Sequence, residues 1–150
     1  MTTQQLLLCT LLTTSLAQSQ APPTTPKARV FIYQTKLRTT RANPIFCDGL
    51  QVASLRHRWS YFVLQVDAGE HVFRGRHKEN EIVIDLSPGH DYFLRVDQLT
   101  NGWIPYEKLV RETTEQGHLM ATSGKLHPIE PGDVNDQSKV SLVFADSSTR

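Results

Sequence analysis

Two turn sequences, each set between alternating apolar runs, constrain this fold more than any other feature. The stretch "VDAGEHVFRG" spans residues 66–75, and "LSPGHDYFLRV" follows at residues 86–96. In each turn a glycine, Gly69 or Gly89, stands where the backbone needs a residue without Cβ, and Pro88 fixes φ in the second turn. The flanking runs place apolar side chains at every second position, which is the period of a half-buried strand. Both stretches are therefore predicted to be β-hairpins.

The clearest hairpin signal is "PIFCDGLQVASL" at residues 44–55. Asp48 and Gly49 form the residue pair that a two-residue type I′ turn favours, because both tolerate positive φ. Regular pairing around this turn sets Cys47 opposite Leu50 and places alternate side chains on the same face of the hairpin. The pattern predicts a buried face made of four side chains: Ile45, Cys47, Leu50 and Val52.

The strand pattern as a whole predicts the fold class. Short apolar runs recur at roughly 8–12-residue spacing with turn residues between them, which is typical of an antiparallel sandwich. We therefore expect an all-β fold, a single antiparallel β-sandwich built of short hairpins. One short helical turn is expected in "TTEQGHLMATS" (residues 113–123), where Gly117 costs about 1 kcal/mol relative to alanine. The Asn-Gly turn at residues 101–102 precedes an aromatic group that can pack on the sandwich edge.

Length and charge limit the domain count and the partners. The chain of 150 residues fits one folded domain with a modest core, expected at residues 28–122. Residues 123–150 form a Gly/Pro-rich tail with one further strand-like stretch, "KVSLVFA". The 16 basic and 15 acidic side chains nearly cancel, so no broad electrostatic footprint for nucleic acid or an anionic membrane is present.

The first residues differ in character from the rest. The run "LLLCTLLTTSLA" at residues 6–17 is shorter than the roughly 20 apolar residues that span a bilayer. It ends in small residues, and Ser15 and Ala17 occupy the positions of a small-x-small cleavage site, with a second site at Ser19 and Ala21. Residues 1–17 are therefore predicted to be a signal peptide and residues 18–27 a Pro/Thr-rich tether. We expect an exported protein, periplasmic or secreted, without a transmembrane span.

The order of the predicted strands resembles a bacterial envelope family, domain of unknown function 2846, whose hairpins are akin to those of PEGA domains. The resemblance covers residues 28–121, and its matching positions are Asp48, Gly49, Gly69, His71, Pro88, Gly89 and Tyr92. Ala68 stands where the family has a proline, and residues 99–106 are only vaguely similar. The resemblance implies a β-sandwich and an exported location, and it brings no catalytic residue.

The chemically reactive residues form no recognisable catalytic or metal-binding pattern. The six histidines lack the spacing of metal ligands: His57, His71, His77, His90, His118 and His127. His71 starts a strand beside a turn, where its ring can hydrogen-bond a turn carbonyl or carboxylate. A nucleophilic pair of Cys47 with a histidine is disfavoured because the hairpin places the thiol among apolar side chains. No catalytic residue, cofactor or metal is predicted.

A candidate binding surface lies in "RHRWSYF" at residues 56–62, which alternates cations with aromatic rings. Arg56, Arg58, Trp59 and Tyr61 could stack on sugars and hold carboxylate or phosphate groups. In the alternative interpretation, the two aromatic side chains cover the core while the arginines lie in solvent. A second basic cluster at residues 74–78 precedes two glutamates and is interpreted as a solvated hairpin tip.

Two functions remain open at this point. The first is an exported, non-enzymatic binding or accessory module of the bacterial cell envelope, with a glycan or another envelope protein as its ligand. The alternative is an enzyme whose site is assembled from scattered histidine, aspartate and arginine residues. A closed polar pocket with at least two histidines would favour the enzyme.

The cleavage sites give a first testable prediction. We expect the mature chain to begin at Gln18 or Pro22, because cleavage follows the small residue at Ala17 or Ala21. Intact-mass measurement of the exported protein checks this expectation. A full-length cytosolic species as the main product would contradict it.

Overall fold

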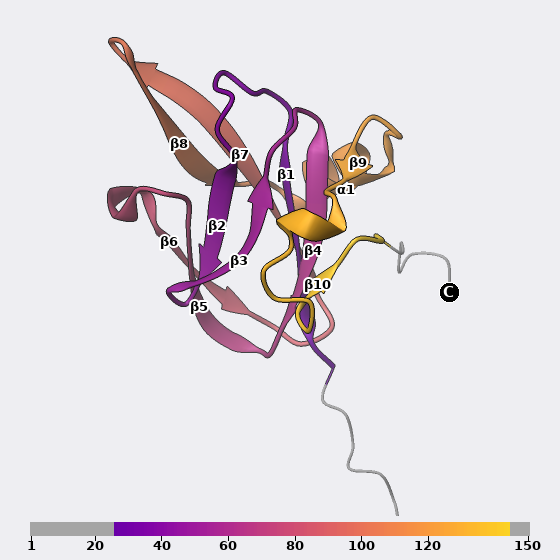
Figure 1. Ribbon diagram of the computed structural model, residues 1–150. Coiled ribbons are helices and arrows are strands. Elements are labelled where there is room, and N and C mark those ends of the chain that lie inside the picture. The colour runs from indigo at the N-terminus through magenta and orange to yellow at the C-terminus, as the bar shows by residue number, and fades with distance from the viewer. Residues whose placement is uncertain (1–25, 145–150) are drawn as a thin grey trace, which may run out of the picture.

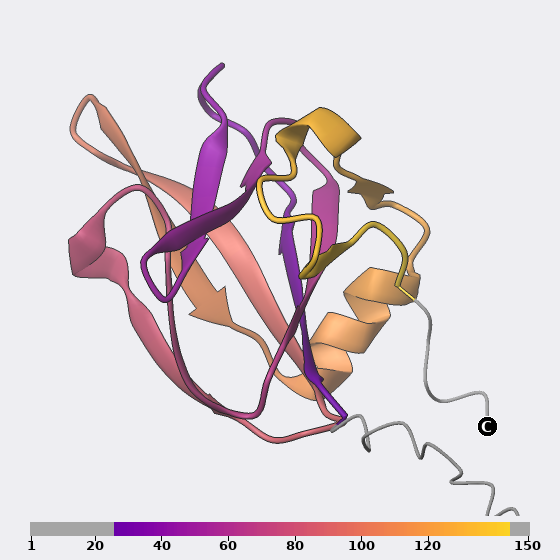
Figure 2. The same ribbon diagram turned by 60° about the horizontal axis from the view of Figure 1, so that its bottom comes forward.

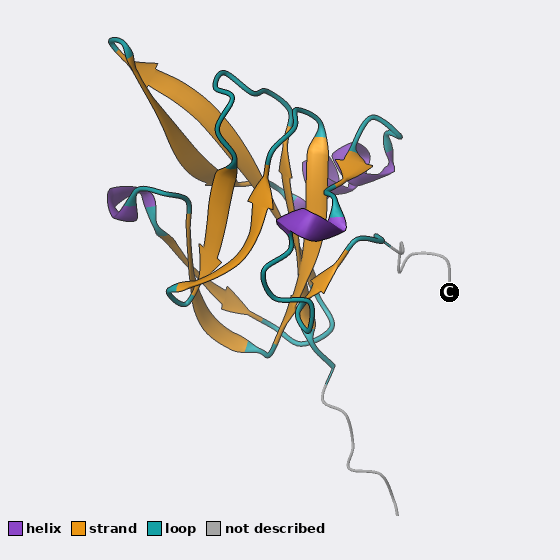
Figure 3. Cartoon of the chain, in the orientation of Figure 1, coloured by secondary structure: helices purple, strands orange, loops and turns teal. Residues whose placement is uncertain are grey.

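The computed structural model describes residues 26–144 as a sandwich of two twisted sheets (Figures 1 and 3). The larger sheet has the order β10 (Val140–Ser141), β4 (Ser60–Val66), β1 (Ala28–Gln34), β7 (Asp91–Asn101) and β8 (Ile104–Arg111), and β9 (His127–Pro128) also pairs with β4. The smaller sheet has the order β3 (Leu50–Leu55), β2 (Asn43–Cys47), β5 (Gly69–Arg74) and β6 (Ile82–Leu86). The predicted all-β sandwich is confirmed. The predicted signal peptide and most of the predicted tether lie outside the described residues.

Most strand pairs are antiparallel, as expected, but two are parallel. β1 runs parallel to β7 and β9 runs parallel to β4. Because β1 and β7 lie far apart in the sequence, no local turn sequence could predict their pairing. It places β1 in the middle of the larger sheet, between β4 and β7.

The β2–β3 hairpin forms around the predicted type I′ turn, with φ of 50° at Asp48 and 82° at Gly49. Cys47 pairs with Leu50 as expected, but a β-bulge makes Ile45 pair with Ala53 instead of Val52.

The predicted buried face of this hairpin is also wrong at Leu50, which is 66% exposed. Leu50 begins β3, the edge strand of the smaller sheet, whereas Cys47 lies on β2 and pairs on its other side with Phe73. The cysteine is therefore covered while its cross-strand partner faces solvent.

The two turns that were predicted to close hairpins connect the two sheets instead. β4 belongs to the larger sheet and β5 to the smaller one, and the chain returns from β6 to β7 in the same way. Gly69 (φ 127°) and Gly89 (φ 74°) do adopt positive φ. The same turn residues suit a hairpin and a crossing between sheets, and only the long-range pairing of the flanking strands distinguishes the two.

Two groups of buried side chains hold the sandwich together. The larger group fills the space between the sheets and includes Val30, Ile32, Phe62 and Leu94. A smaller group lies on the outer face of the larger sheet, beneath α1 (Thr114–Thr122): Phe31, Tyr33, Val63, Phe93 and Leu126. Figure 2 shows α1 lying across this face. Residues 123–144 add β9, β10 and the short helix η2 (Pro131–Asp133), with Leu126 and Ile129 buried.

Helix α1 approaches the sheet closely at Gly117. A Cβ built on Gly117 would lie 1.9 Å from Cγ of Phe93, so the helix can contact the ring only because this residue has no side chain. The glycine weakens the isolated helix, but the close packing of α1 on the sheet requires it.

Replacing Gly117 with alanine should therefore destabilise the protein by about 2 kcal/mol, although alanine favours the helix by about 1 kcal/mol. Gly132→Ala is the matched control, because no atom lies within 4 Å of the Cβ it would add and its φ is not positive. Thermal unfolding of both variants tests this prediction. An increase in Tm for Gly117→Ala would contradict the close approach.

Candidate functional site

The four residues of the predicted binding surface divide into two pairs. Arg56 bonds to the buried carboxylate of Asp133 at 3.0 Å, and the Tyr61 hydroxyl donates to the Leu142 carbonyl at 3.2 Å. The Tyr61 ring also stacks on Phe31 with the ring centroids 4.9 Å apart. Arg56 and Tyr61 thus fasten the C-terminal segment to the sandwich.

Trp59 and Arg58 differ from these two. Arg58 is exposed, whereas Trp59 is partly buried at the edge of the aromatic group under α1. The backbone of Trp59 has a φ of 59°, in the left-handed region that bulky residues avoid at a cost of roughly 1–3 kcal/mol. Its carbonyl accepts a hydrogen bond from His127 N at 2.7 Å, so β9 helps to hold it there.

Trp59 lines a groove between α1 and the larger sheet, with a volume of about 550 Å³. The groove is lined by Tyr33, Trp59, Arg95, Glu112, Gln116, Leu119, Met120, Thr122, Ser123 and Lys125. Aromatic and aliphatic groups therefore share one hollow with hydroxyl, amide and charged groups. We call it the Trp59 groove.

The charge at the floor of the Trp59 groove is fixed in place. Arg95 donates to both carboxylate oxygens of Asp97, at 2.7 and 2.9 Å, and also to Glu112. The hydrogen bonds to Asp97 raise the pKa of Arg95 further above its usual value. Burial, together with the charge of Glu112, raises the pKa of the neighbouring Tyr33 phenol. Arg95 stays charged and Tyr33 stays neutral over the whole physiological range.

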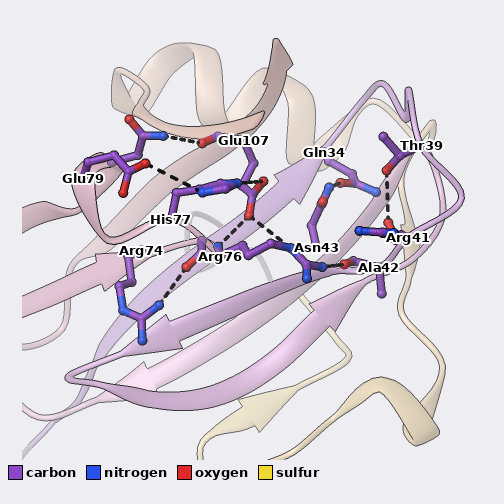
Figure 4. Close-up of polar contacts among 12 residues, drawn as sticks. Gln34, Thr39, Arg41, Ala42, Asn43, Arg74, Arg76, His77, Glu79 and Glu107 are labelled. Carbon is purple, nitrogen blue, oxygen red and sulfur yellow. Dashed lines mark hydrogen bonds and ion pairs between the residues drawn. The ribbon is translucent and has the colours of Figure 1, made fainter. Parts of the chain in front are cut away.

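A second hollow of about 230 Å³ lies at the end of the sandwich where β7 and β8 project, and Figure 4 shows its polar contacts. Its central group is Glu107 on β8, whose side chain is 6% exposed. Oε1 of Glu107 accepts a hydrogen bond from Arg76 N at 2.6 Å, and His77 Nε2 lies 3.8 Å from Oε2. A Cβ on Gly75 would lie 2.6 Å from Cγ of Glu107, so the chain passes directly over this carboxylate. We call this hollow the Glu107 cleft.

Amide side chains close the inner wall of the Glu107 cleft. Asn43 Nδ2 donates to Gln34 Oε1 at 2.8 Å, and Gln34 Nε2 donates to the His57 carbonyl at 2.8 Å. Gln98 accepts a hydrogen bond from the backbone N–H of Arg38. These bonds tie the loops at this end of the sandwich to the strands.

Sequence reasoning missed the Glu107 cleft because it interpreted residues 74–78 as a solvated tip. One signal was present in the strand pattern. Glu107 and Leu109 are two residues apart on β8 and so point to the same, buried face, which puts a carboxylate where an apolar residue is expected. Its partners come from a distant turn, and the strand pattern alone does not pair them.

The Glu107 cleft does not supply the histidine pair that an enzyme was expected to need. His77 is the histidine in its lining, and the Thr39 hydroxyl donates to the Arg41 carbonyl at 3.5 Å instead of facing a base. The lining of the Trp59 groove includes no histidine. The Glu107 cleft therefore holds one histidine beside a carboxylate, and the Trp59 groove offers aromatic, polar and charged groups without a histidine.

The turn residues Asp48 and His71 meet at the opposite end of the sandwich. His71 Nδ1 lies 2.7 Å from Oδ2 of Asp48, and Nε2 lies 2.9 Å from the Asp67 carbonyl. Oδ1 of Asp48 accepts from Val72 N at 2.9 Å. The His71 ring thus bonds both a carboxylate and a turn carbonyl, which are the kinds of partner expected for it beside a turn.

The hydrogen-bond partners determine the charge of the His71 ring. Both nitrogens face acceptors, so both hydrogen bonds form together only when the ring is an imidazolium. Burial alone would lower the pKa of His71, but the bonds to Asp48 and Asp67 outweigh it and raise the pKa above the usual 6.5. Burial would likewise raise the pKa of Asp48, but the hydrogen bonds from Val72 and His71 lower it below 3.8.

Cys47 lies beside this pair, and ligand atoms of Cys47, Asp48 and His71 lie within 4.8 Å of one another. Burial, with the charge of Asp48, raises the pKa of the Cys47 thiol to about 12. A metal ion would have to remove protons from both Cys47 and His71 and break the two bonds of the ring. The cluster fits a structural tie better than a metal site.

No protein-family model matches the chain, and no curated protein or solved structure matches it significantly. The resemblance to domain of unknown function 2846 therefore stays a prediction. Within residues 26–144, no helix has the length and apolar character needed to cross a membrane.

The His71–Asp48 tie predicts a pH-dependent stability. The raised pKa of His71 means that its contribution is complete below about pH 6.5 and is lost as the pH rises through the folded-state pKa. The free-energy difference between the parent and His71→Gln should therefore shrink between about pH 6 and pH 9 in denaturant titrations. His90→Gln is the control, because Nδ1 of His90 lies 3.1 Å from the Pro88 carbonyl at a different turn. A difference that stays constant over this range would show that the ring is not charged.

Proposed function

We propose that this chain is an exported, non-enzymatic binding module of the bacterial cell envelope, and that the Trp59 groove holds its ligand. The observation that carries the proposal is the conformation of Trp59. A bulky residue kept at positive φ beside an open hollow is a strained arrangement of the kind that gathers at functional sites. The hydrogen bond from β9 and the packing under α1 hold the indole at the rim.

The groove favours a glycan as the ligand. Sugars present apolar C–H faces that pack on aromatic rings, and hydroxyl groups that need hydrogen-bond partners. Trp59 supplies a partly exposed ring, and Gln116, Ser123 and Lys125 supply polar groups around it. An aromatic hollow with a polar rim meets both needs of a sugar.

One observation favours an envelope protein as a second candidate. Leu119 on α1 is 73% exposed and lines the same groove. It therefore adds exposed apolar surface against which a peptide or protein side chain could pack. The two ligands differ in a testable way, since only the glycan is destroyed by glycan-degrading enzymes.

A binding role also agrees with the state of the titratable side chains outside the Trp59 groove. The raised pKa of the Cys47 thiol keeps it protonated, the His71 ring bonds Asp48 and the Asp67 carbonyl, and the Glu107 carboxylate accepts a hydrogen bond from Arg76 N. Each of these groups is occupied in holding the fold together.

The proposal predicts that exposed groove residues control binding without affecting stability. A Leu119→Ala, Lys125→Ala double variant should bind purified envelope glycan at least about tenfold more weakly, because it loses an apolar contact and a charged donor. Its Tm should stay within about 2 °C of the parent, because both side chains are exposed. Val143→Ala, at an exposed apolar residue outside the lining, is the matched control.

The same experiment separates the two ligands. If the double variant loses capture from envelope extract but not from purified glycan, the ligand is a protein. Equal binding by parent and double variant in both assays would show that the Trp59 groove is not the ligand-binding site. A Trp59→Ala variant that unfolds would show that the indole belongs to the core.

A further inference from the structure

The tip of the β7–β8 hairpin is the most exposed apolar feature of the described residues. Trp103 is 100% exposed and Ile104 is 70% exposed, while Leu99 on the other strand is 37% exposed. The expectation that this aromatic group packs on the sandwich edge is therefore wrong for Trp103. β7 and β8 pair as far as Asn101 and Ile104, which carries the tip beyond the rest of the sandwich in both views (Figures 1 and 2).

The turn itself fixes the position of this tryptophan. Gly102 is the first of the two turn residues and has a φ of 61°, the position and sign that a type II′ turn reserves for glycine. Trp103 follows as the second turn residue, at the end of a paired two-stranded ribbon. The indole is thus presented at a fixed point and is not carried on a free loop.

Positive charge flanks the hairpin along one loop, although the chain as a whole is nearly neutral. The loop at residues 35–42 contains Lys36, Arg38 and Arg41, which are all exposed and have no ion pair within residues 26–144. The loop lies against the hairpin, because Arg38 N donates to Gln98 of β7 and Arg41 lines the Glu107 cleft together with Ile104. We call these three residues the basic loop.

Most of the negative charge near the tip is paired or buried. Residues 98–106 contain no charged side chain. Asp97 is bound by Arg95, and Glu107 is buried in the cleft. The exposed carboxylate of Glu79 lies on the short helix η1 (Lys78–Asn80), which also carries Lys78, and Glu79 lines a hollow with Asn101 and Ile104 of the hairpin.

We propose that the β7–β8 tip and the basic loop dock this protein onto the surface of an anionic phospholipid bilayer. Tryptophan favours the headgroup region because its ring is apolar and its N–H needs a polar partner. Ile104 enters beside it, and the three cations lie over anionic headgroups. Only the turn enters the interface, so the strand pair keeps its hydrogen bonds. The near-zero net charge is no obstacle, because attraction to a surface acts within a Debye length of roughly 8–10 Å.

A protein partner is less well matched to this feature. A stable protein interface buries about 800 Å² on each side, in a continuous face with a packed centre. The tip is a narrow projection flanked by cations, and a bilayer can accept it without a complementary pocket.

Trp103 can report its own environment in the test. The chain has two tryptophans, so a Trp59→Phe variant of the full chain leaves Trp103 as the one indole, and residues 1–25 contribute none. We expect a blue shift of its fluorescence with vesicles of phosphatidylcholine containing about a third phosphatidylglycerol. The shift should decline as salt rises to about 0.5 M, because salt screens the attraction. If Trp59→Phe does not fold, the difference between parent and Trp103→Phe spectra gives the same signal.

Variants test the two parts of the surface separately by vesicle co-sedimentation. Trp103→Ala should weaken binding about tenfold, and replacing the three basic-loop residues with glutamine should weaken it on the order of a hundredfold, about fivefold for each cation. Leu50→Ala is the matched control, because Leu50 is an exposed apolar residue at a hairpin tip on the opposite end of the sandwich.

Three results would overturn the proposal: no blue shift with anionic vesicles, equal binding to neutral vesicles, or a blue shift that depends on protein concentration without vesicles. The last result would identify a second copy of the chain as the partner of the tip.

The proposal goes beyond the glycan- or protein-binding role and is independent of it. The Leu119→Ala, Lys125→Ala variant should bind vesicles as well as the parent does, so failure of one proposal is distinguishable from failure of the other.

Discussion

The structure depends on β1 pairing between β4 and β7. Six of the seven residues of this strand are buried, and its apolar side chains alternate between the two hydrophobic groups of the protein. Val30 and Ile32 face the space between the sheets, whereas Phe31 and Tyr33 face α1. Without β1 the two halves of the larger sheet would lose their shared strand, and α1 would lose much of the surface on which it packs. The Trp59 groove, which includes Tyr33, rests on the same strand.

The two ends of the sandwich are built differently around this strand. At one end the turns are tied together by His71, which joins the β2–β3 turn at Asp48 to the β4–β5 connection at Asp67. At the other end buried amides, Gln34 and Asn43, satisfy backbone and side-chain groups while leaving loops and a cleft around them. Closed turns suit stability, whereas the end with the longer loops carries the exposed tryptophan and the free cations. The end that ties the turns together is thus separate from the end that we propose faces a partner.

The sequence predicted those features that local turn chemistry determines. Gly49 adopts positive φ because it has no Cβ, and Asp48 because aspartate tolerates this conformation, so the β2–β3 turn could be placed from two residues. The strand period likewise located β1, β4 and β7. The pairing partners of β4 and β6 could not be predicted, because inward-facing apolar residues on either sheet satisfy the same pattern. The Glu107 cleft was missed for a related reason: its carboxylate, glycine and histidine come from segments that only the tertiary fold brings together.

β7 links the two surfaces for which we propose roles. Arg95 forms the floor of the Trp59 groove, and six residues further along the same strand Asn101 begins the turn that presents Trp103. At about 3.3 Å per residue, this distance corresponds to roughly 20 Å along the strand. A protein that rests on a bilayer through its hairpin tip would hold the groove at about that height above the headgroups. Because the paired strands make the spacing rigid, docking would fix both the distance and the orientation at which the groove meets an envelope ligand. The hairpin would then act as a spacer as well as an anchor.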